Sequence, residues 1–373
     1  MTRARDVATE PTRANAKGDI YTATADNTPA VLTVGSDGQT LVANSAQTTG
    51  LAYTNNFAAG KNKIINGDFG VWQRGTSFSN PTNGTYTADR WFVELDGTGY
   101  TRTISQQTFT PGTAPVAGYE GQYFYRWNNS VAGTGNTINA LSTRLEDIRT
   151  FAGQTITFSF WAKADASRAL TVYAYQQSTG GSGTVTTTVG SATLTTSWAR
   201  YTMTVAIPSL SGITIGTNSN LQIRIAMPTG VTMTCDFWGM QMEANSVATA
   251  FQTATGTIQG ELAACQRYYY RQTADGDLYQ NFGFGMVTNT TTSARIQISN
   301  PVTMRAKPTS IDFATLRTAD YGAGYAVSAI TFGETGIYSN WLTVTMAAGT
   351  AYRPVALGAN NSNTAYIGVS AEL

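Results

Sequence analysis

Two groups of aromatic side chains alternate along predicted strands and could bind a sugar. Tyr123, Tyr125 and Trp127 share one face of a strand, and Tyr173 and Tyr175 share one face of another. Aromatic rings can stack on sugars, while amides and carboxylates bind the hydroxyl groups. Either group could equally lie in the core or between subunits. Both are therefore candidate glycan sites, with these two alternatives open.

Enzyme chemistry finds little support in the residue types. The chain has no histidine, which excludes a Ser-His-Asp triad and removes the commonest general base and transition-metal ligand. A glycosidase needs two carboxylates facing one sugar bond. The acidic residues are scattered, and the adjacent pair Glu146-Asp147 belongs to a predicted solvated connection. We see no phosphate-binding loop and no internal repeats, so we predict that the protein is not an enzyme.

The elements that would carry these aromatics are strands. Ile156, Phe158 and Phe160 fall on one face of a segment whose other face is polar, which is the period of a strand packed on one side. The same alternation continues in residues 170–175, 201–207, 221–225 and 231–237. Several such strands separated by turns indicate two packed antiparallel sheets. The alternation changes phase at Gly239, which predicts a β-bulge there.

Residues 61–252 resemble the jelly-roll carbohydrate-binding modules of the family 4/9 type, most closely those in tail and fibre proteins of tailed bacteriophages. The resemblance lies in the order and spacing of residues 62–69, 86–91, 144–164 and 236–243. It implies that the first and last strands lie side by side. Trp72, Trp91 and Trp161 are assigned to the core.

A structural Ca²⁺ between the first and last strands is a further implication of this resemblance. Calcium prefers oxygen ligands, and Asp68 and Asp236 lie in the corresponding segments. The chain departs from the family pattern at Gly70, where an acidic residue often lies. Surface or turn aspartates are the alternative.

Residues 1–60 should form a virion-anchoring arm and an extended β connector. Short β-segments alternate here with Asn, Asp and Gly turns, and large apolar residues are too few for a separate core. The connector must therefore pack on neighbouring chains or on its own later domain. Residues 17–51 resemble a segment of phage tail and fibre proteins that commonly forms an intertwined trimeric connector. The polar residues 1–16 are expected to dock on a partner.

A linking helix is predicted within residues 253–272. Ile258, Leu262, Cys265 and Tyr269 are spaced as one apolar stripe of a helix. The helix could rest on its own domain or lie at a threefold axis. Residues 261–270 resemble the junction that follows such jelly rolls. Residues 273–373 alternate again and predict a second, smaller β-sandwich, in which residues 302–309 resemble a turn of phage fibre domains.

Composition limits the remaining classes of function. Charged residues are 12% of the 373 and the net charge is +1, so nucleic acid or anionic membrane is not an expected partner. No apolar run approaches the roughly 20 residues of a membrane span. No secretory signal is apparent, and Cys235 and Cys265 are expected to be packed, reduced thiols.

We predict an all-β bacteriophage virion protein: a homotrimeric tail or head fibre that attaches to other virion proteins through residues 1–60 and to a host surface glycan. The alternative is a purely structural decoration or connector without sugar binding. No cofactor is expected beyond the structural calcium.

Overall fold

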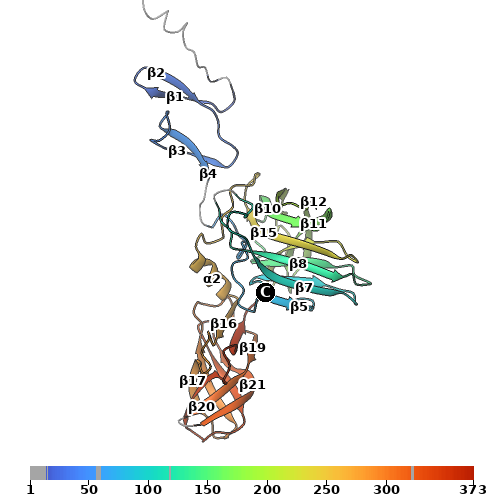
Figure 1. The fold of residues 1–373 in the computed structure, drawn as a ribbon, viewed down its shortest axis with the longest axis vertical. Helices are drawn as coiled ribbons and strands as arrows, with labels where there is room; N and C mark the ends of the chain where they lie inside the picture. Colours follow the sequence, from blue (N-terminus) through green and yellow to red (C-terminus); the bar gives the residue numbers. More distant parts are fainter. Residues whose placement is uncertain (1–13, 15, 56–59, 117–118, 321–322) are drawn as a thin grey trace, which may run out of the picture.

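The chain is described by a computed structural model that places residues 14, 16–55, 60–116, 119–320 and 323–373. Most of the predicted docking segment 1–16 lies outside this set. The molecule is elongated, with two hairpins at one end, a sandwich projecting to one side in the middle and a barrel at the other end (Figure 1). The predicted all-β class is confirmed. Within the described ranges, no helix has the length and apolar character needed to cross a bilayer.

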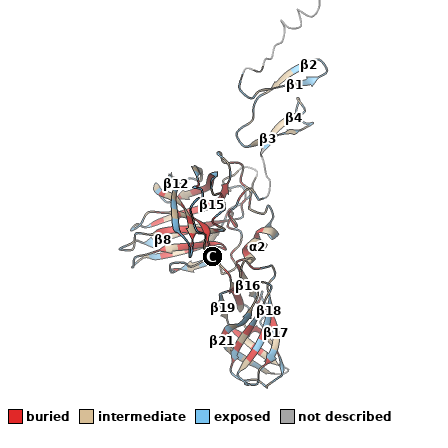
Figure 2. Ribbon diagram, turned by 180° about the vertical axis from the view of Figure 1, so that it is seen from behind, coloured by how far each residue is buried: buried red, intermediate tan, exposed pale blue. Residues whose placement is uncertain are grey.

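The N-terminal connector consists of two separate hairpins. β1 (Ile20–Ala25) pairs with β2 (Thr28–Leu32), and β3 (Gln39–Ala43) pairs with β4 (Leu51–Asn55). None of the described residues 16–54 is buried, as Figure 2 also shows. The turn at Gly38 lies against the sandwich, since a Cβ there would be 2.8 Å from Cγ2 of Thr249. Isolated two-stranded hairpins are marginally stable at best, so this region needs further contacts.

Residues 61–252 form two antiparallel sheets packed face to face, as predicted. The six-stranded sheet has the order β13-β10-β15-β8-β7-β5, and the five-stranded sheet has the order β12-β11-β14-β9-β6. The strands are β5 (Ser77–Ser79), β6 (Trp91–Leu95), β7 (Thr101–Thr108), β8 (Tyr123–Val131), β9 (Asn139–Glu146), β10 (Thr155–Ala164), β11 (Arg168–Ser178), β12 (Gly183–Leu194), β13 (Ala199–Ala206), β14 (Asn220–Ala226) and β15 (Met233–Glu243).

The sandwich core contains the side chains that the alternation indicates. Ile156, Phe158 and Phe160 are fully buried between the sheets, with Trp91 and Trp72 in the same cluster. Trp161 is also buried, but it belongs to a second aromatic cluster together with Phe109, Phe124, Trp238 and Phe251. This cluster buries the outer face of β10 at Trp161, whereas Thr157 and Ser159 on that face bond to Asn245 O and Arg200.

Two finer expectations for the sandwich are confirmed. Gly239 has a positive φ of 66°, and the pairing of β10 with β15 shifts register beside it, so the bulge is present. The opening segment runs beside the last strand: Lys63 N donates to Met242 O at 3.0 Å, and Met240 N donates to Gly67 O at 2.8 Å.

The linking helix α2 (Ile258–Gln266) is shorter than the predicted stripe. Thr257 caps its N-terminus by accepting a hydrogen bond from Gly260 N at 3.0 Å. Glu261 and Cys265 face the protein, whereas Ile258 is 82% exposed and Leu262 is 38% exposed. The assignment of Tyr269 to the helix is wrong, because this residue lies on strand β16 beyond the helix. Cys235 and Cys265 are free, buried thiols, as expected.

The C-terminal β-domain is present, but its main sheet is closed. β17 (Asn281–Val287), β18 (Ser293–Ser299), β22 (Ser339–Met346), β21 (Ala323–Thr335), β20 (Leu316–Asp320) and β23 (Pro354–Ala359) form a barrel in that order. β16 (Tyr269–Thr273), β24 (Tyr366–Ser370) and β19 (Ser310–Ala314) form a small sheet beside it. A barrel therefore replaces the two open sheets of the predicted second sandwich. Pairing of β23 with both β17 and β20 closes it.

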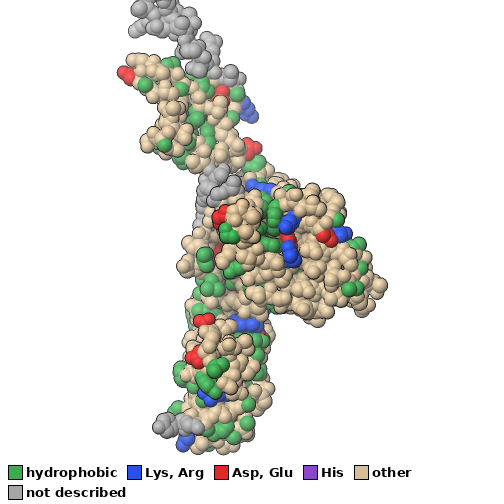
Figure 3. Space-filling view, viewed as in Figure 1, with side chains coloured by type: hydrophobic (Ala, Val, Ile, Leu, Met, Phe, Trp, Pro, Cys, Tyr) green, Lys and Arg blue, Asp and Glu red, His purple; other side chains and the backbone are tan. Residues whose placement is uncertain are grey.

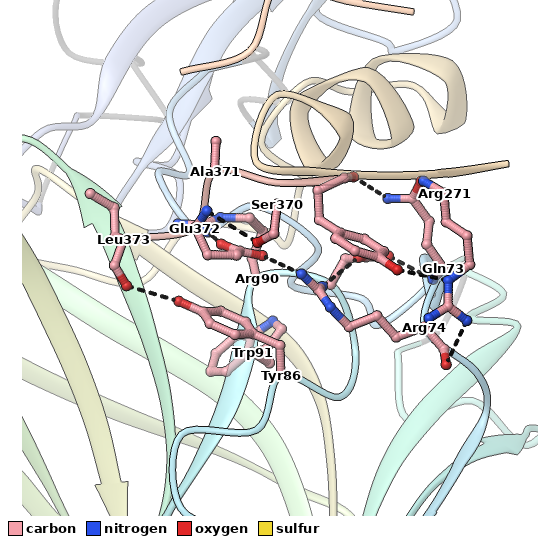
Figure 4. A network of polar contacts seen from close by, with 12 residues as sticks. Gln73, Arg74, Tyr86, Arg90, Trp91, Arg271, Ser370, Ala371, Glu372 and Leu373 are labelled. Atoms are coloured by element: carbon pink, nitrogen blue, oxygen red, sulfur yellow. Dashed lines mark hydrogen bonds and ion pairs between the residues drawn. The ribbon is translucent and has the colours of Figure 1, made fainter. Parts of the chain in front are cut away.

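The sandwich and the C-terminal domain are joined by polar contacts (Figure 4). Arg90 forms an ion pair with Glu372, and its guanidinium lies 3.5 Å from the centre of the Tyr268 ring. Arg74 reaches the same carboxylate at 3.3 Å. Tyr86 donates its hydroxyl hydrogen to Leu373 O at 3.2 Å. Residues 372–373 therefore lie against the sandwich.

Candidate functional site

The aromatic group on β8 cannot form a sugar platform. Tyr125 and Trp127 are fully buried between the two sheets, where Tyr125 hydrogen-bonds Thr87 and the Trp127 indole donates to Asn129. The prediction of a glycan site on these two residues is wrong, because this face of β8 points toward the other sheet. Tyr123, at the start of the strand, is half-buried and lines a separate cleft.

Tyr173 and Tyr175 lie on the outer face of the five-stranded sheet. Their rings are half-buried and 6.0 Å apart, with an interplanar angle of 36°. Their backbone partners on β14 are Arg224 and Gln222. On the other side, three threonines of β12 continue the same face and are exposed: Thr184, Thr186 and Thr188. We call this surface the tyrosine face; it comprises Glu94, Tyr173, Tyr175, Arg224 and these three threonines, with the buried Ser142 and Gln222 beneath them.

A hydrogen-bond network centred on Glu94 fixes the polar part of the tyrosine face. Glu94 accepts from Nε of Arg224 at 2.6 Å, from Nη2 of Arg224 at 2.7 Å and from Gln222 at 2.8 Å. Ser142 donates to the same carboxylate. Arg224 also donates through Nη1 to the Tyr175 hydroxyl at 3.0 Å. The network therefore connects strands β6, β9, β14 and β11.

The charges on the tyrosine face are paired. Burial alone would raise the pKa of Glu94, but the hydrogen bonds from Arg224 and Ser142 outweigh it and lower that pKa. Glu94 thus stays ionised opposite Arg224, and the pair carries no net charge. This fixed array of donors and acceptors beside two rings suits a neutral polyhydroxyl ligand.

Sequence reasoning missed Glu94, Gln222 and Arg224 as site residues. The available signal was the alternation of Gln222 and Arg224 with buried apolar neighbours on β14. Nothing in the sequence indicated that Glu94 bonds to Gln222 and Arg224. Glu94 lies on β6, which is separated from β14 by β9 in the sheet.

A second concave region lies between the sandwich and α2. This cleft has a volume of about 450 Å³ and is lined by Asp68, Tyr119, Tyr123, Ile258 and Glu261, among others. It brings together Asp68, predicted as a calcium ligand, Tyr123, predicted as a sugar contact, and Ile258, predicted on the apolar stripe of the helix. Burial and the neighbouring Glu261 carboxylate raise the pKa of Asp68 to about 6. The oxygens of Glu261 accept from Asn66 N and Thr255 N, so this residue ties segments together.

The predicted calcium ligands do not form a shared site. Asp236 receives two hydrogen bonds from Arg126, at 2.7 and 2.8 Å, and lies 3.6 Å from Nζ of Lys163. Asp68 lines the cleft described above. Among the residues that the structure describes, no group of three or more His, Cys, Asp or Glu could hold a metal. The ammonium of Lys61 bridges the opening segment to Thr249 Oγ1 at 2.6 Å and Ala250 O at 2.7 Å. Asp236 is therefore held by two cations and is unsuited to bind calcium, whereas calcium binding at Asp68 stays a prediction.

Comparisons with known proteins find similar solved structures only. No family model matches the chain, and no curated protein matches it. A structure described as "CBM4 structure and function" has 18% identity and a TM-score of 0.31, covering 49% of this chain and all of that one. The CBM22-2 xylan-binding domain of Paenibacillus barcinonensis Xyn10C has 14% identity and a TM-score of 0.30, covering 49% of this chain and 98% of that one.

A phage protein is also among the similar structures. The enzymatically active domain of bacteriophage CBA120 tailspike protein 4 has 11% identity and a TM-score of 0.31. The match covers 50% of this chain and 22% of the tailspike chain. All of these values are too low for a ligand or an activity to be transferred.

Proposed function

We propose that this chain is a bacteriophage virion protein, a trimeric tail or head fibre whose jelly roll binds a glycan on the host cell surface. The tyrosine face carries the proposal. It presents two neighbouring rings, Tyr173 and Tyr175, next to the ion pair between Glu94 and Arg224. The rings offer stacking surfaces, and the tyrosine and threonine hydroxyls and the Arg224 guanidinium offer hydrogen bonds.

Low surface charge supports a neutral glycan as the ligand. Figure 3 shows few charged side chains on the visible surface. Charged residues make up 12% of the chain. Electrostatic steering toward a strongly charged partner is therefore weak, and recognition must come from stacking and hydrogen bonding.

The trimer is supported by where apolar side chains are exposed. In the described parts of the chain, Val131 is the only exposed large apolar side chain within the sandwich. Tyr21, on the first hairpin, and Ile258 and Leu262, on α2, are exposed. The hairpins contain no buried residue among 16–54. Association with further copies of the chain would cover these groups.

The alternative is a structural decoration protein without sugar binding. It is favoured by one observation: the donors of Arg224 and Gln222 already bind Glu94, so the network could simply stabilise the sheet. Under both proposals the protein has no catalytic activity. Reducing-sugar release from host polysaccharide by the folded protein would contradict that part.

A glycan panel tests the proposal directly. The labelled full chain is applied to immobilised neutral and acidic oligosaccharides, together with a Tyr173→Ala/Tyr175→Ala variant and a Tyr338→Ala control. Tyr338 is 68% exposed and lies outside the tyrosine face. We expect the wild type and the control to bind a neutral glycan and the double variant to lose that binding. Equal binding by all three would exclude the tyrosine face. No binding by the folded wild type would favour the structural alternative.

A further inference from the structure

The C-terminal barrel carries an open groove that the jelly-roll site does not involve. Its volume is about 750 Å³, within the range of small-ligand sites. Lining residues include Met286, Asn289, Arg295, Glu334, Trp341 and Tyr352. The barrel is the part of the molecule farthest from the hairpins (Figure 1).

Tyr352 has an unusual backbone conformation at one side of this groove. Its φ is +63°, in the left-handed region that aromatic residues disfavour, and its side chain is 67% exposed. The turn is held in place because Tyr352 N donates to Val287 O at 3.1 Å and Val287 N donates to Arg353 O at 3.0 Å. The ring is therefore exposed at a fixed position beside the groove, where a ligand can reach it.

Trp341 and an ion pair complete the groove. Trp341, on β22, is 36% exposed, and the Arg295 guanidinium lies 5.7 Å from its ring centre. Nη2 of Arg295 is 3.1 Å from Oε1 of Glu334, and both side chains are open to solvent. The groove therefore combines two accessible rings with a planar donor and a planar acceptor whose charges cancel.

We propose that this groove is a second glycan site, which binds a neutral oligosaccharide independently of the tyrosine face. Trp341 and Tyr352 provide the stacking surfaces. Arg295 donates to sugar hydroxyls and Glu334 accepts from them. The cancelled charge disfavours an ionic ligand, because a charged ligand would have to break the pair between Arg295 and Glu334.

The test uses Tyr352→Gly and Trp341→Thr in the full chain. Glycine accepts a positive φ without strain, so Tyr352→Gly removes the ring without lowering the thermal midpoint. Threonine suits a strand position. Tyr338→Ala is the matched control, since Tyr338 is an exposed aromatic outside the groove. Binding of cellohexaose, xylohexaose, maltohexaose and the acidic polygalacturonate is measured by titration, and the oligomeric mass by light scattering.

We expect both groove variants to lose at least about tenfold in affinity for one neutral oligosaccharide, while the control keeps it. Unchanged binding by both variants, or no neutral ligand for the wild type, would overturn the proposal. So would a fall in oligomeric mass without a loss of sugar binding, which would identify the groove as a contact between copies. A parallel Tyr173→Ala/Tyr175→Ala variant separates the two sites: if it alone loses binding, the groove proposal fails and the jelly-roll proposal stands.

Discussion

Glu372 forms an ion pair with Arg90, although 282 positions separate them in the sequence. The Arg90 side chain is 2% exposed and the Glu372 side chain 8%. Arg74 joins the same carboxylate, and Tyr268 covers the Arg90 guanidinium. The buried Arg90 cation therefore gains the Glu372 counter-charge only when the segment after β24 is in place. This makes the sandwich and the C-terminal domain depend on each other.

Replacement of Glu372 by glutamine should destabilise the protein by about 3 kcal/mol, because it leaves a buried guanidinium without its counter-charge. The measurement is urea unfolding followed by fluorescence. Asp147→Asn serves as the control: it breaks the exposed pair with Arg149 and should change stability by no more than about 0.5 kcal/mol. Equal effects of the two substitutions would show that the contact between the domains contributes little.

Alanine at Gly239 should cost about 3 kcal/mol, of which the left-handed backbone accounts for about 1 kcal/mol and overpacking for the rest. The Cβ would lie 2.7 Å from Cε3 of Trp161. Gly180 has a similar φ of +77°, but a Cβ there would have no atom within 4 Å. Thermal unfolding of Gly180→Ala therefore measures the backbone cost alone. If both variants lose the same stability, the bulge does not press on Trp161.

Asp68 should make the protein less stable as the pH rises from about 4 to about 7. Its pKa is raised from 3.8 to about 6 in the folded protein, so the folded state binds more protons than the unfolded state between these values. Asp68→Asn should remove this dependence and stabilise the protein at pH 7 by up to about 3 kcal/mol. Unfolding at several pH values, with the exposed Asp275→Asn as control, tests it. A wild type whose stability rises over this range relative to Asp68→Asn would contradict the sign.

Helix α2 should contribute to the trimer. Ile258→Asp changes a side chain that is 82% exposed, so the fold of one copy should be preserved while association weakens. Light scattering at micromolar concentration should show a trimer for the wild type and a lower mass for the variant. Val131→Asp, on the exposed end of β8, should leave the mass unchanged. A monomeric wild type would exclude the trimer.

The strands and the sandwich could be predicted because alternation reports directly which side chains face a core. The same alternation could not separate Tyr125 and Trp127 from Tyr173 and Tyr175. Both sets are aromatic with period two, and only the packing of the sheets decides that one set faces inward. The Glu94 network could not be predicted from the sequence either, because it requires β9 to lie between β6 and β14 in the sheet.

Other differences arise from contacts between distant segments. Tyr269 fits a helical spacing, yet its backbone pairs with Ser370 on β24 and the helix ends before it. The barrel closes through pairing of β23 with β17 and β20, which no local pattern specifies. The resemblance to carbohydrate-binding modules suggested calcium at Asp68 and Asp236. Only the fold shows that Arg126 and Lys163 lie beside Asp236.

The most direct test of the account is native affinity electrophoresis in gels that contain the polysaccharide selected by the glycan panel. Wild-type protein and the Tyr173→Ala/Tyr175→Ala variant are run side by side, with Tyr338→Ala as control. We predict retardation of the wild type and the control and a marked loss of retardation in the double variant, with any remaining retardation due to the groove of the C-terminal barrel. Equal retardation of all three would contradict the claim that the tyrosine face binds the glycan.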